Sequence, residues 1–124
     1  MISYAMVGTK DIKRASEFFD KVLGIVGAER VMEGDTTIMW SDGQPDKPFF
    51  GVCLPHDGNK ASVGNGTMIS FGATSKEQVN EIYKCAMDNG GRCEGEPGMR
   101  GESYYLGYFR DPDGNKFSVF YPVS

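Results

Sequence analysis

The chain has 124 residues with 17 acidic against 13 basic side chains, a formal net charge of −4, and 40% hydrophobic and 12% aromatic residues. This describes one compact domain, or two very small fused units, and it lacks the basic excess with which nucleic-acid-binding proteins neutralise phosphates. Because no stretch approaches the roughly 20 apolar residues of a membrane span and the first residues do not resemble a signal peptide, we expect a soluble, cytoplasmic protein without membrane partners.

Clusters of glycine, proline, Asp and Asn divide the chain into eight predicted strands and two predicted helices. The strands are short, aromatic and often β-branched, and we expect them at about residues 3–8, 28–33, 36–40, 49–54, 67–73, 92–94, 103–110 and 116–122. The helices are expected at about 11–23 and 75–88. The order is strand, helix and three strands, and then the same again.

Both predicted helices are amphipathic and carry recognisable end signals. Asp11 is placed to cap the first helix and Gly24 to stop it, while Ser75 and Gln78 match a capping box at the start of the second. The buried stripe of the first helix is predicted to contain Ile12, Ala15, Phe18, Phe19, Val22 and Leu23. The corresponding stripe of the second, which ends at Asn89-Gly90-Gly91, contains Val79, Ile82, Tyr83, Ala86 and Met87.

The repeated order of elements indicates an internal duplication with an offset of 64 residues. At this offset five apolar positions of one helix lie opposite five of the other, Gly8 lies opposite Gly72, and Gly27 opposite Gly91. A single βαβββ unit cannot bury both faces of its sheet, so we predict an α+β fold in which two such modules pair around a curved mixed sheet that encloses a cavity. The predicted single domain comprises a module at about 1–58, a linker at about 56–66 and a second module at about 67–124.

The cysteine and histidine content argues against a metal site of common type. Cys53, Cys85 and Cys93 are an odd number without a C-x-x-C spacing, so we expect reduced thiols rather than a disulfide framework or a thiolate zinc site. His56 is the single histidine, and its polar surroundings predict a solvated loop residue. Any transition-metal site would therefore need Asp, Glu or Cys for its other ligands.

Two segments carry a resemblance to a known family. One is the hairpin Tyr108-Phe109-Arg110-Asp111-Pro112-Asp113-Gly114-Asn115-Lys116, and the other is the opening strand followed by Thr9 to Gly24. With them the chain resembles the vicinal oxygen chelate superfamily, which contains glyoxalase I, fosfomycin and bleomycin resistance proteins and extradiol dioxygenases. Asn65-Gly66-Thr67 resembles its glyoxalase-like bacterial branch. Physically, the segment from Asp111 to Asn115 is expected to be a turn whose side chains bond its own backbone.

The resemblance implies four metal-ligand positions, usually His, Glu or Gln, on the first, fourth, fifth and eighth strands. In this chain they fall on Tyr4, Cys53 as the most plausible fourth-strand residue, Met68 and Ser118. A thioether, a thiol and hydroxyls make a poor site for hard or borderline divalent ions. We therefore expect no metal and no cofactor, although Cys53 could act as a soft ligand.

Strand alternation predicts which side chains face the cavity. Leu106 joins the candidate ligand-binding residues Tyr4, Met6, Cys53, Met68, Ser70, Tyr108, Ser118 and Phe120. The opposite face, toward the helices, is predicted to contain Ala5, Val7, Ile69, Phe71, Phe109 and Phe117. Such a lining suits an uncharged or weakly polar small molecule, with the Tyr108 hydroxyl as the best candidate for a polar contact. Trp40 and Arg100 could close over the ligand from the cavity rim.

Two functions remain open from the sequence. The first is a metal-free protein that sequesters a small molecule, as bleomycin resistance proteins do. The second is an enzyme: a metal-independent lyase or isomerase that uses Tyr4, Tyr108, Cys53 or Ser118, a dioxygenase-type enzyme, or a protein similar to lactoylglutathione lyase. No catalytic residue is assigned. The resemblance also implies a homodimer, since members often associate through the edges of their modules.

Overall fold

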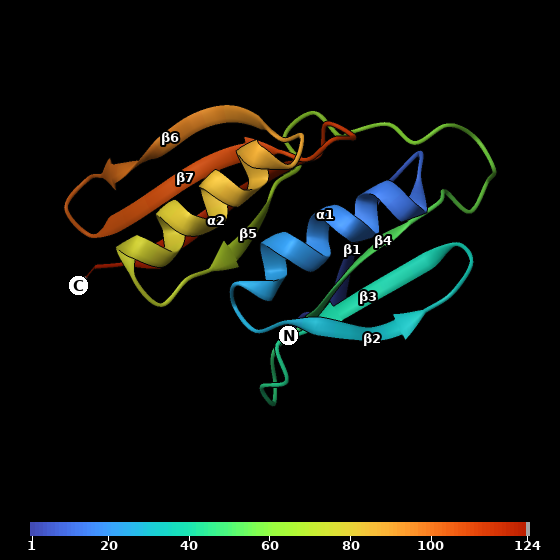
Figure 1. Ribbon diagram of the computed structural model, residues 1–124, viewed down its shortest axis with the longest axis horizontal. Helices are drawn as coiled ribbons and strands as arrows, with labels where there is room; N and C mark the ends of the chain where they lie inside the picture. The colour runs from blue at the N-terminus through green and yellow to red at the C-terminus, as the bar shows by residue number, and fades with distance from the viewer. Residues whose placement is uncertain (124) are drawn as a thin grey trace. The chain divides into compact units, whose positions relative to one another are not determined.

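Each half of the chain folds as four strands and one helix in the order βαβββ (Figure 1). The computed structural model describes residues 1–123, and the chain divides into two units, Met1–Val63 and Gly64–Ser124. We refer to them as unit 1 and unit 2. Each unit holds a four-stranded mixed sheet, so the predicted α+β class and the two βαβββ modules are confirmed.

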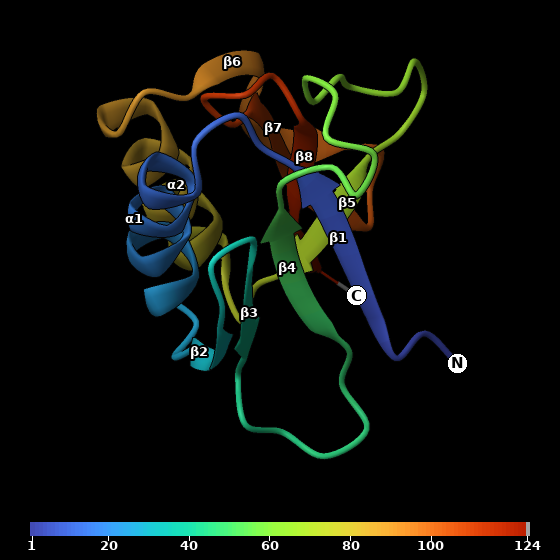
Figure 2. The same cartoon turned by 90° about the vertical axis from the view of Figure 1, so that its right-hand side faces the viewer.

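Unit 1 packs its helix against one face of its sheet (Figure 2). Its elements are β1 (Tyr4–Gly8), α1 (Ile12–Gly24), β2 (Glu29–Glu33), β3 (Thr37–Ser41) and β4 (Phe49–Cys53), and the strand order is β1-β4-β3-β2. β1 runs parallel to β4, and the other neighbours are antiparallel. The Phe19 ring of α1 lies 4.8 Å from Phe50 and 5.8 Å from Trp40, between ring centroids. Burial of these aromatic side chains stabilises unit 1.

Unit 2 repeats this arrangement in the order β5-β8-β7-β6. Its elements are β5 (Ile69–Gly72), α2 (Lys76–Asp88), β6 (Arg92–Arg100), β7 (Tyr104–Arg110) and β8 (Lys116–Pro122). The helix α2 packs on β7, β6 and β8 (Figure 1). The Tyr105 hydroxyl of β7 donates to Asn80 Oδ1 of α2 at 2.7 Å. This bond identifies the helix-covered face of the sheet, to which the odd-numbered residues of β7 belong.

The predicted internal repeat is confirmed by the order and spacing of the elements. α1 and α2 each have 13 residues, and Ile12–Gly24 and Lys76–Asp88 are separated by the predicted offset of 64. The strand order is the same in both units, and in each unit the strand before the helix runs parallel to the last strand.

The helix starts follow the sequence signals more closely than the helix ends do. Asp11 Oδ1 accepts from Arg14 N at 3.1 Å, and Ser75 Oγ accepts from Gln78 N at 3.0 Å, as predicted. The Gln78 side chain accepts from Thr74 N at 2.8 Å, one residue before the cap. α1 ends at Gly24, but Gly24 is not the left-handed residue, because the positive φ falls on Gly27 at 81°. No helix within residues 1–123 is long and apolar enough to cross a membrane.

The strand β6 is longer than predicted. It continues from Arg92 to Arg100 through Gly95, Pro97 and Gly98, which the sequence marks as breakers. The register shifts between Cys93 and Gly95 and again between Gly95 and Gly98. β6 is the edge strand of its sheet, where the missing N–H of proline and the irregular pairing of a bulge are tolerated.

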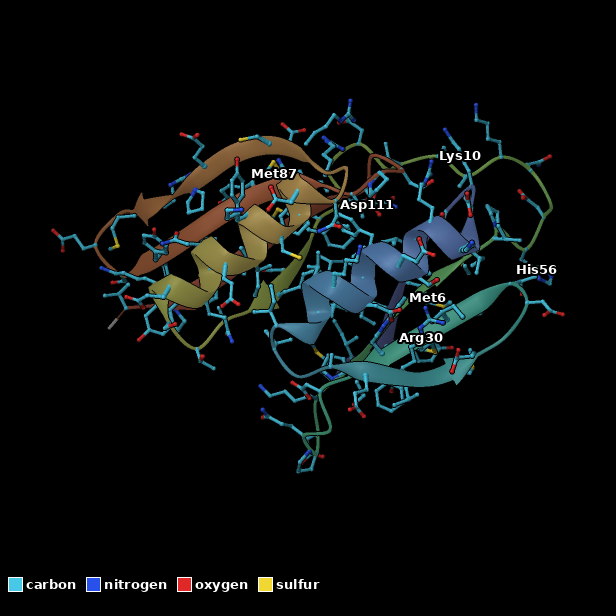
Figure 3. All side chains as sticks on the ribbon, in the orientation of Figure 1. Met6, Lys10, Arg30, His56, Met87 and Asp111 are labelled. Carbon is cyan, nitrogen blue, oxygen red and sulfur yellow. The ribbon has the colours of Figure 1, made fainter. Side chains whose placement is uncertain are left out.

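The turn between β7 and β8 is built around the buried carboxylate of Asp111, labelled in Figure 3. Its Oδ1 accepts from Asp113 N at 3.0 Å and Asn115 N at 2.8 Å, and its Oδ2 accepts from Asn115 Nδ2 at 3.0 Å. Gly114 supplies the positive φ of 93° that the turn requires. The prediction of a turn held by its own side chains is confirmed.

Asp111 generates a pH-dependent stability. Burial raises the pKa of Asp111 from 3.8 to about 6, against the opposing effect of its hydrogen bonds from Asn115. The folded state therefore binds this proton more tightly than the unfolded chain, so the contribution of Asp111 is greatest below the unfolded pKa and falls as the pH rises through 6.

We predict that the free energy of unfolding of the unmodified protein falls by about 2 kcal/mol relative to the Asp111→Asn variant between about pH 4.5 and pH 7. Urea denaturation of both proteins across this range measures the difference. Because other carboxyl groups titrate in both proteins, the comparison isolates Asp111. A difference that does not change with pH would contradict the raised pKa.

Candidate functional site

One face of the unit 2 sheet is covered by α2, and we call the opposite face the uncovered face. It carries a row of hydroxyl groups. Ser70 of β5 pairs with Ser118 of β8, Ser118 pairs with Tyr108 of β7, and Tyr108 pairs with Gly95 of β6. Since these residues alternate with Phe109 and Phe117, which are fully buried, they lie on the face opposite α2. We call Ser70, Ser118 and Tyr108 the hydroxyl row. With strands about 4.8 Å apart, it extends about 10 Å from Ser70 to Tyr108.

Ser118 orients Ser70. Ser118 is 1% exposed, and its Oγ donates to Ser70 Oγ at 2.7 Å, whereas Ser70 is exposed. Because Ser70 Oγ accepts the hydrogen bond from Ser118, the hydroxyl proton of Ser70 can be donated to a ligand. The pair thus presents one oriented donor at the start of the row.

Each of the two strands that flank β7 carries a cation close to the Tyr108 ring. Lys116 Nζ of β8 lies 5.6 Å from the ring centroid, and Arg100 Cζ of β6 lies 5.7 Å from it. The residue paired with Tyr108 is Gly95, where an added Cβ would lie 3.1 Å from Tyr108 Cδ2 and 3.4 Å from Arg100 Nη2. The absence of a side chain at Gly95 therefore leaves the space in which the ring and the guanidinium meet.

A second row beside the first is apolar. Gly72, Phe120 and Leu106 are paired across β5, β8 and β7, two residues along from the hydroxyl row. The Phe120 ring packs against Tyr104 with centroids 5.3 Å apart. We call Phe120 and Leu106 the apolar row. The face therefore offers hydroxyl donors and cations on one side and an apolar surface on the other, as a ligand site does.

The candidate residues of unit 1 also share the face opposite their helix. Along β1 and β4, Tyr4, Met6 and Cys53 point to the face opposite that of the buried Phe50 and Val52. Tyr4 is 59% exposed. Met68 is exposed but precedes β5, so no strand pairing fixes its position. The structure thus aligns Ser70, Ser118, Tyr108 and Phe120 within unit 2, and places Tyr4, Met6 and Cys53 on one face of unit 1.

The strand register corrects the fourth-strand position. In unit 2 Ser118 pairs with Ser70, and the residue 64 positions before Ser70 is Met6, which pairs with Gly51. The residue of unit 1 that matches Ser118 is therefore Gly51 rather than Cys53. A Cβ at Gly51 would lie 3.0 Å from Met39 Cγ and 3.5 Å from Met6 Cε, so two methionines close over it.

The donor groups at these positions do not fit a divalent metal. A phenol, a glycine, a thioether and a serine hydroxyl replace the imidazole and carboxylate ligands that such ions prefer. Within residues 1–123, no group of three or more His, Cys, Asp or Glu side chains could hold a metal ion. Burial raises the pKa of the half-buried Cys53 thiol, which disfavours the thiolate form that binds metals or attacks substrates.

The structure also places Trp40 and His56 within unit 1. Trp40 is 1% exposed, and its Nε1 donates to Asp20 Oδ1 of α1 at 3.0 Å, so the prediction that it closes over a ligand is wrong. The Arg30 guanidinium, together with this indole, holds the pKa of Asp20 below its usual value. His56 is exposed in the loop after β4, as predicted (Figure 3).

The sequence suggested Arg100 as a residue at the rim of the site, but it did not predict that Arg100 and Lys116 would both lie near Tyr108. Lys116 shares the parity of Ser118 in the predicted strand, so its side of the sheet could be read from alternation. Arg100 could not be placed in the same way, because the two register shifts of β6 break the alternation that would assign its face.

The chain thus belongs to the α+β proteins that are built from two tandem βαβββ modules. In each module a helix covers one face of the sheet, and the candidate ligand residues lie on the other face. The family model of the Glyoxalase/Bleomycin resistance protein/Dioxygenase superfamily matches residues 1–119. The chain therefore belongs to this superfamily, and the resemblance inferred from the turn motif is confirmed. No curated protein matches the chain.

Solved structures agree with this assignment. A glyoxalase/bleomycin resistance protein from Albidiferax ferrireducens T118 is 34% identical, with a TM-score of 0.89 and coverage of 98% of each chain. A glyoxalase/bleomycin resistance protein/dioxygenase family enzyme from Burkholderia phytofirmans PsJN is 19% identical, with a TM-score of 0.78 over 98% of each chain. A lactoylglutathione lyase from Agrobacterium tumefaciens is 20% identical, with a TM-score of 0.72 over 98% of this chain and 92% of its own. The last two show the shared fold.

The packing over Gly51 predicts a sensitive position. We expect Gly51→Ala to lower the free energy of unfolding by about 1–3 kcal/mol, because its Cβ would press on Met39 and on the Ile38 carbonyl oxygen 3.1 Å away. Gly72→Ala is the matched control, since a Cβ on this strand glycine meets no atom within 4 Å. Urea denaturation measures both variants, and an equal effect of the two would show that the methionine packing is not responsible.

Proposed function

We propose that this chain is a metal-independent member of its superfamily that binds a small molecule on the uncovered face of the unit 2 sheet. The observation that carries the proposal is the hydroxyl row lying beside the apolar row. Ser70 and Tyr108 supply hydrogen bonds that orient a ligand, and Phe120 and Leu106 supply apolar contact. Tyr4, Met6 and Cys53, on the corresponding face of unit 1, are further candidates for ligand contact.

Binding accounts for these features better than catalysis. The raised pKa of Cys53 argues against a thiolate nucleophile. Ser118 is buried and donates a hydrogen bond to Ser70, so each of these two hydroxyls is bonded to the other rather than to a basic side chain. A serine nucleophile requires an adjacent base, and this contact does not provide one. Sequestration of a ligand needs neither. The cytoplasmic location and the homodimer implied by the family are part of the same proposal.

Metal titration tests the metal-independent part of the proposal. We expect the melting temperature of chelator-dialysed protein to change by less than about 1 °C on addition of micromolar zinc, nickel, manganese or iron, since a ligand stabilises a protein only if it binds the folded state. Differential scanning fluorimetry and metal analysis of the purified protein measure this. A rise of several degrees with one metal, reversed by chelator, would overturn metal independence.

A small-molecule thermal-shift screen tests the binding surface. For any compound that raises the melting temperature, we expect Tyr108→Phe and Met68→Ala each to weaken binding by about threefold to tenfold, through loss of a hydrogen bond or of apolar contact. Tyr105→Phe is the matched control, because it removes a hydroxyl from the helix-covered face of the same strand. Equal binding by all the variants would place the ligand elsewhere.

A further inference from the structure

The charges on the uncovered face of unit 2 oppose the charge of the whole chain. The protein has a net charge of −4, yet Arg100, Arg110 and Lys116 are gathered around Tyr108. Arg110 is neutralised, because its Nε pairs with Glu94 and its Nη1 donates to the Gly114 carbonyl oxygen at 2.8 Å. Arg110, Lys116 and Arg92 together hold the pKa of Glu94 below its usual value.

The other two cations are not held in a salt bridge with a described residue, although Lys116 is close enough to Glu94 to help lower the pKa of that carboxyl. Within the part of the chain that the structure describes, Arg100 and Lys116 form no salt bridge, whereas Arg30, Lys84 and Arg110 each do. Arg100 Nη2 donates to the Glu96 carbonyl oxygen at 2.9 Å, and Nη1 donates to the Met99 carbonyl oxygen at 3.5 Å. A guanidinium has five donors, so others remain for a ligand.

The ring of Tyr108 does not compensate these charges. A cation near an aromatic face gains only about 0.5–1 kcal/mol at an exposed site, and both cations keep their full charge. Lys116 is half-buried and Tyr108 is half-buried, which strengthens the attraction of any anion that enters between them. The two positive groups come from the strands on either side of β7 and lie near the Tyr108 ring. An anionic group that binds there gains charge-assisted hydrogen bonds.

We propose that the ligand of this face is a small organic anion, with its carboxylate or phosphate beside Tyr108 between Arg100 and Lys116, and its apolar body on Phe120 and Leu106. This inference rests on the proposed binding function and replaces the weakly polar ligand expected from the sequence. The Tyr108 hydroxyl donates to the anionic group, and the oriented Ser70 hydroxyl, about 10 Å away along the hydroxyl row, is available to a second polar group of the ligand. Gly95 is required, because a side chain there would occupy the space beside the ring.

Matched acid and amide probes test the charge of the ligand. The pairs are 4-phenylbutyrate with 4-phenylbutyramide, hexanoate with hexanamide, and benzoate with benzamide, while phenyl phosphate distinguishes a phosphate from a carboxylate site. Titrations followed by two-dimensional NMR give the Kd of each probe and the residues whose amides shift. We expect at least one acid to bind about tenfold or more tightly than its amide, with shifts at Tyr108 and Ser118, and the preference to shrink as salt rises.

Variants that remove a positive charge test whether Arg100 and Lys116 cause the preference for acids over amides. The double variant Arg100→Gln with Lys116→Gln is expected to abolish this preference, while the apolar part of the ligand still contacts Phe120 and Leu106. Lys84→Gln is the matched control, because it removes a positive charge from the exposed side of α2 and should leave the preference unchanged. Circular dichroism and the NMR spectrum show that each variant is folded.

The outcomes separate this inference from the proposed function. If neutral compounds bind the hydroxyl row and acids bind no better than their amides, the anion inference is overturned and the binding function stands. The same holds if the acid preference survives in the double variant, or if Lys84→Gln reduces it equally. If neither these probes nor any compound of the screen binds, both proposals fail together.

Discussion

The carboxylate of Asp111 determines where every side chain of the last hairpin points. By accepting from two backbone N–H groups of its own turn and from Asn115 Nδ2, it holds the turn at a length that pairs Arg110 with Lys116. From that pair the register places Tyr108 opposite Ser118 and Phe109 opposite Phe117. A slip of one residue would move the phenylalanines to the uncovered face and bury the hydroxyls under α2. The core and the candidate site of unit 2 thus depend on one buried carboxylate.

The two units share their helices and strand order but differ in the residues on their uncovered faces. Helix length, cap position and strand order are the same in both, because each βαβββ unit must bury the same helix face on the same sheet face. The uncovered faces are under no such constraint. Where unit 2 pairs two hydroxyls, Ser70 and Ser118, unit 1 pairs Met6 with Gly51. The unit 1 face is accordingly closed by methionine side chains, and the polar contacts gather on unit 2.

Most of the fold could be predicted because its signals are local. The caps at Asp11 and Ser75, the helical stripes and the turn at Asp111 each depend on side chains within a few residues, and all were found. The misses involve non-local pairing. β6 continues through Pro97 because it lies at a sheet edge, and Trp40 faces α1 because Asp20, twenty residues earlier, accepts its indole N–H.

The candidate site was predictable only in part for the same reason. Strand parity placed Ser70, Tyr108, Ser118 and Phe120 on one face, but parity cannot say which residues are opposite one another across strands. The strand register supplied that information. It shows that Gly51, rather than Cys53, is the unit 1 residue that corresponds to Ser118. The structure also places the Arg100 guanidinium of the irregular strand β6 near the ring of Tyr108. The structure thus adds two cations, Arg100 and Lys116, to the hydroxyl and apolar side chains that parity had placed on this face.

The bulges at two sheet edges also affect how the protein behaves at high concentration. β2 shifts register between Arg30 and Met32, and β6 shifts twice and contains Pro97. A regular edge strand exposes an unbroken series of N–H and C=O groups that strands of other molecules can extend, and this is a common route to aggregation. Irregular backbone interrupts that series on β2 and β6. These outer strands are therefore poor templates for strand addition from another molecule, and the apolar residues Val31 and Met32 can be exposed there with less risk of aggregation.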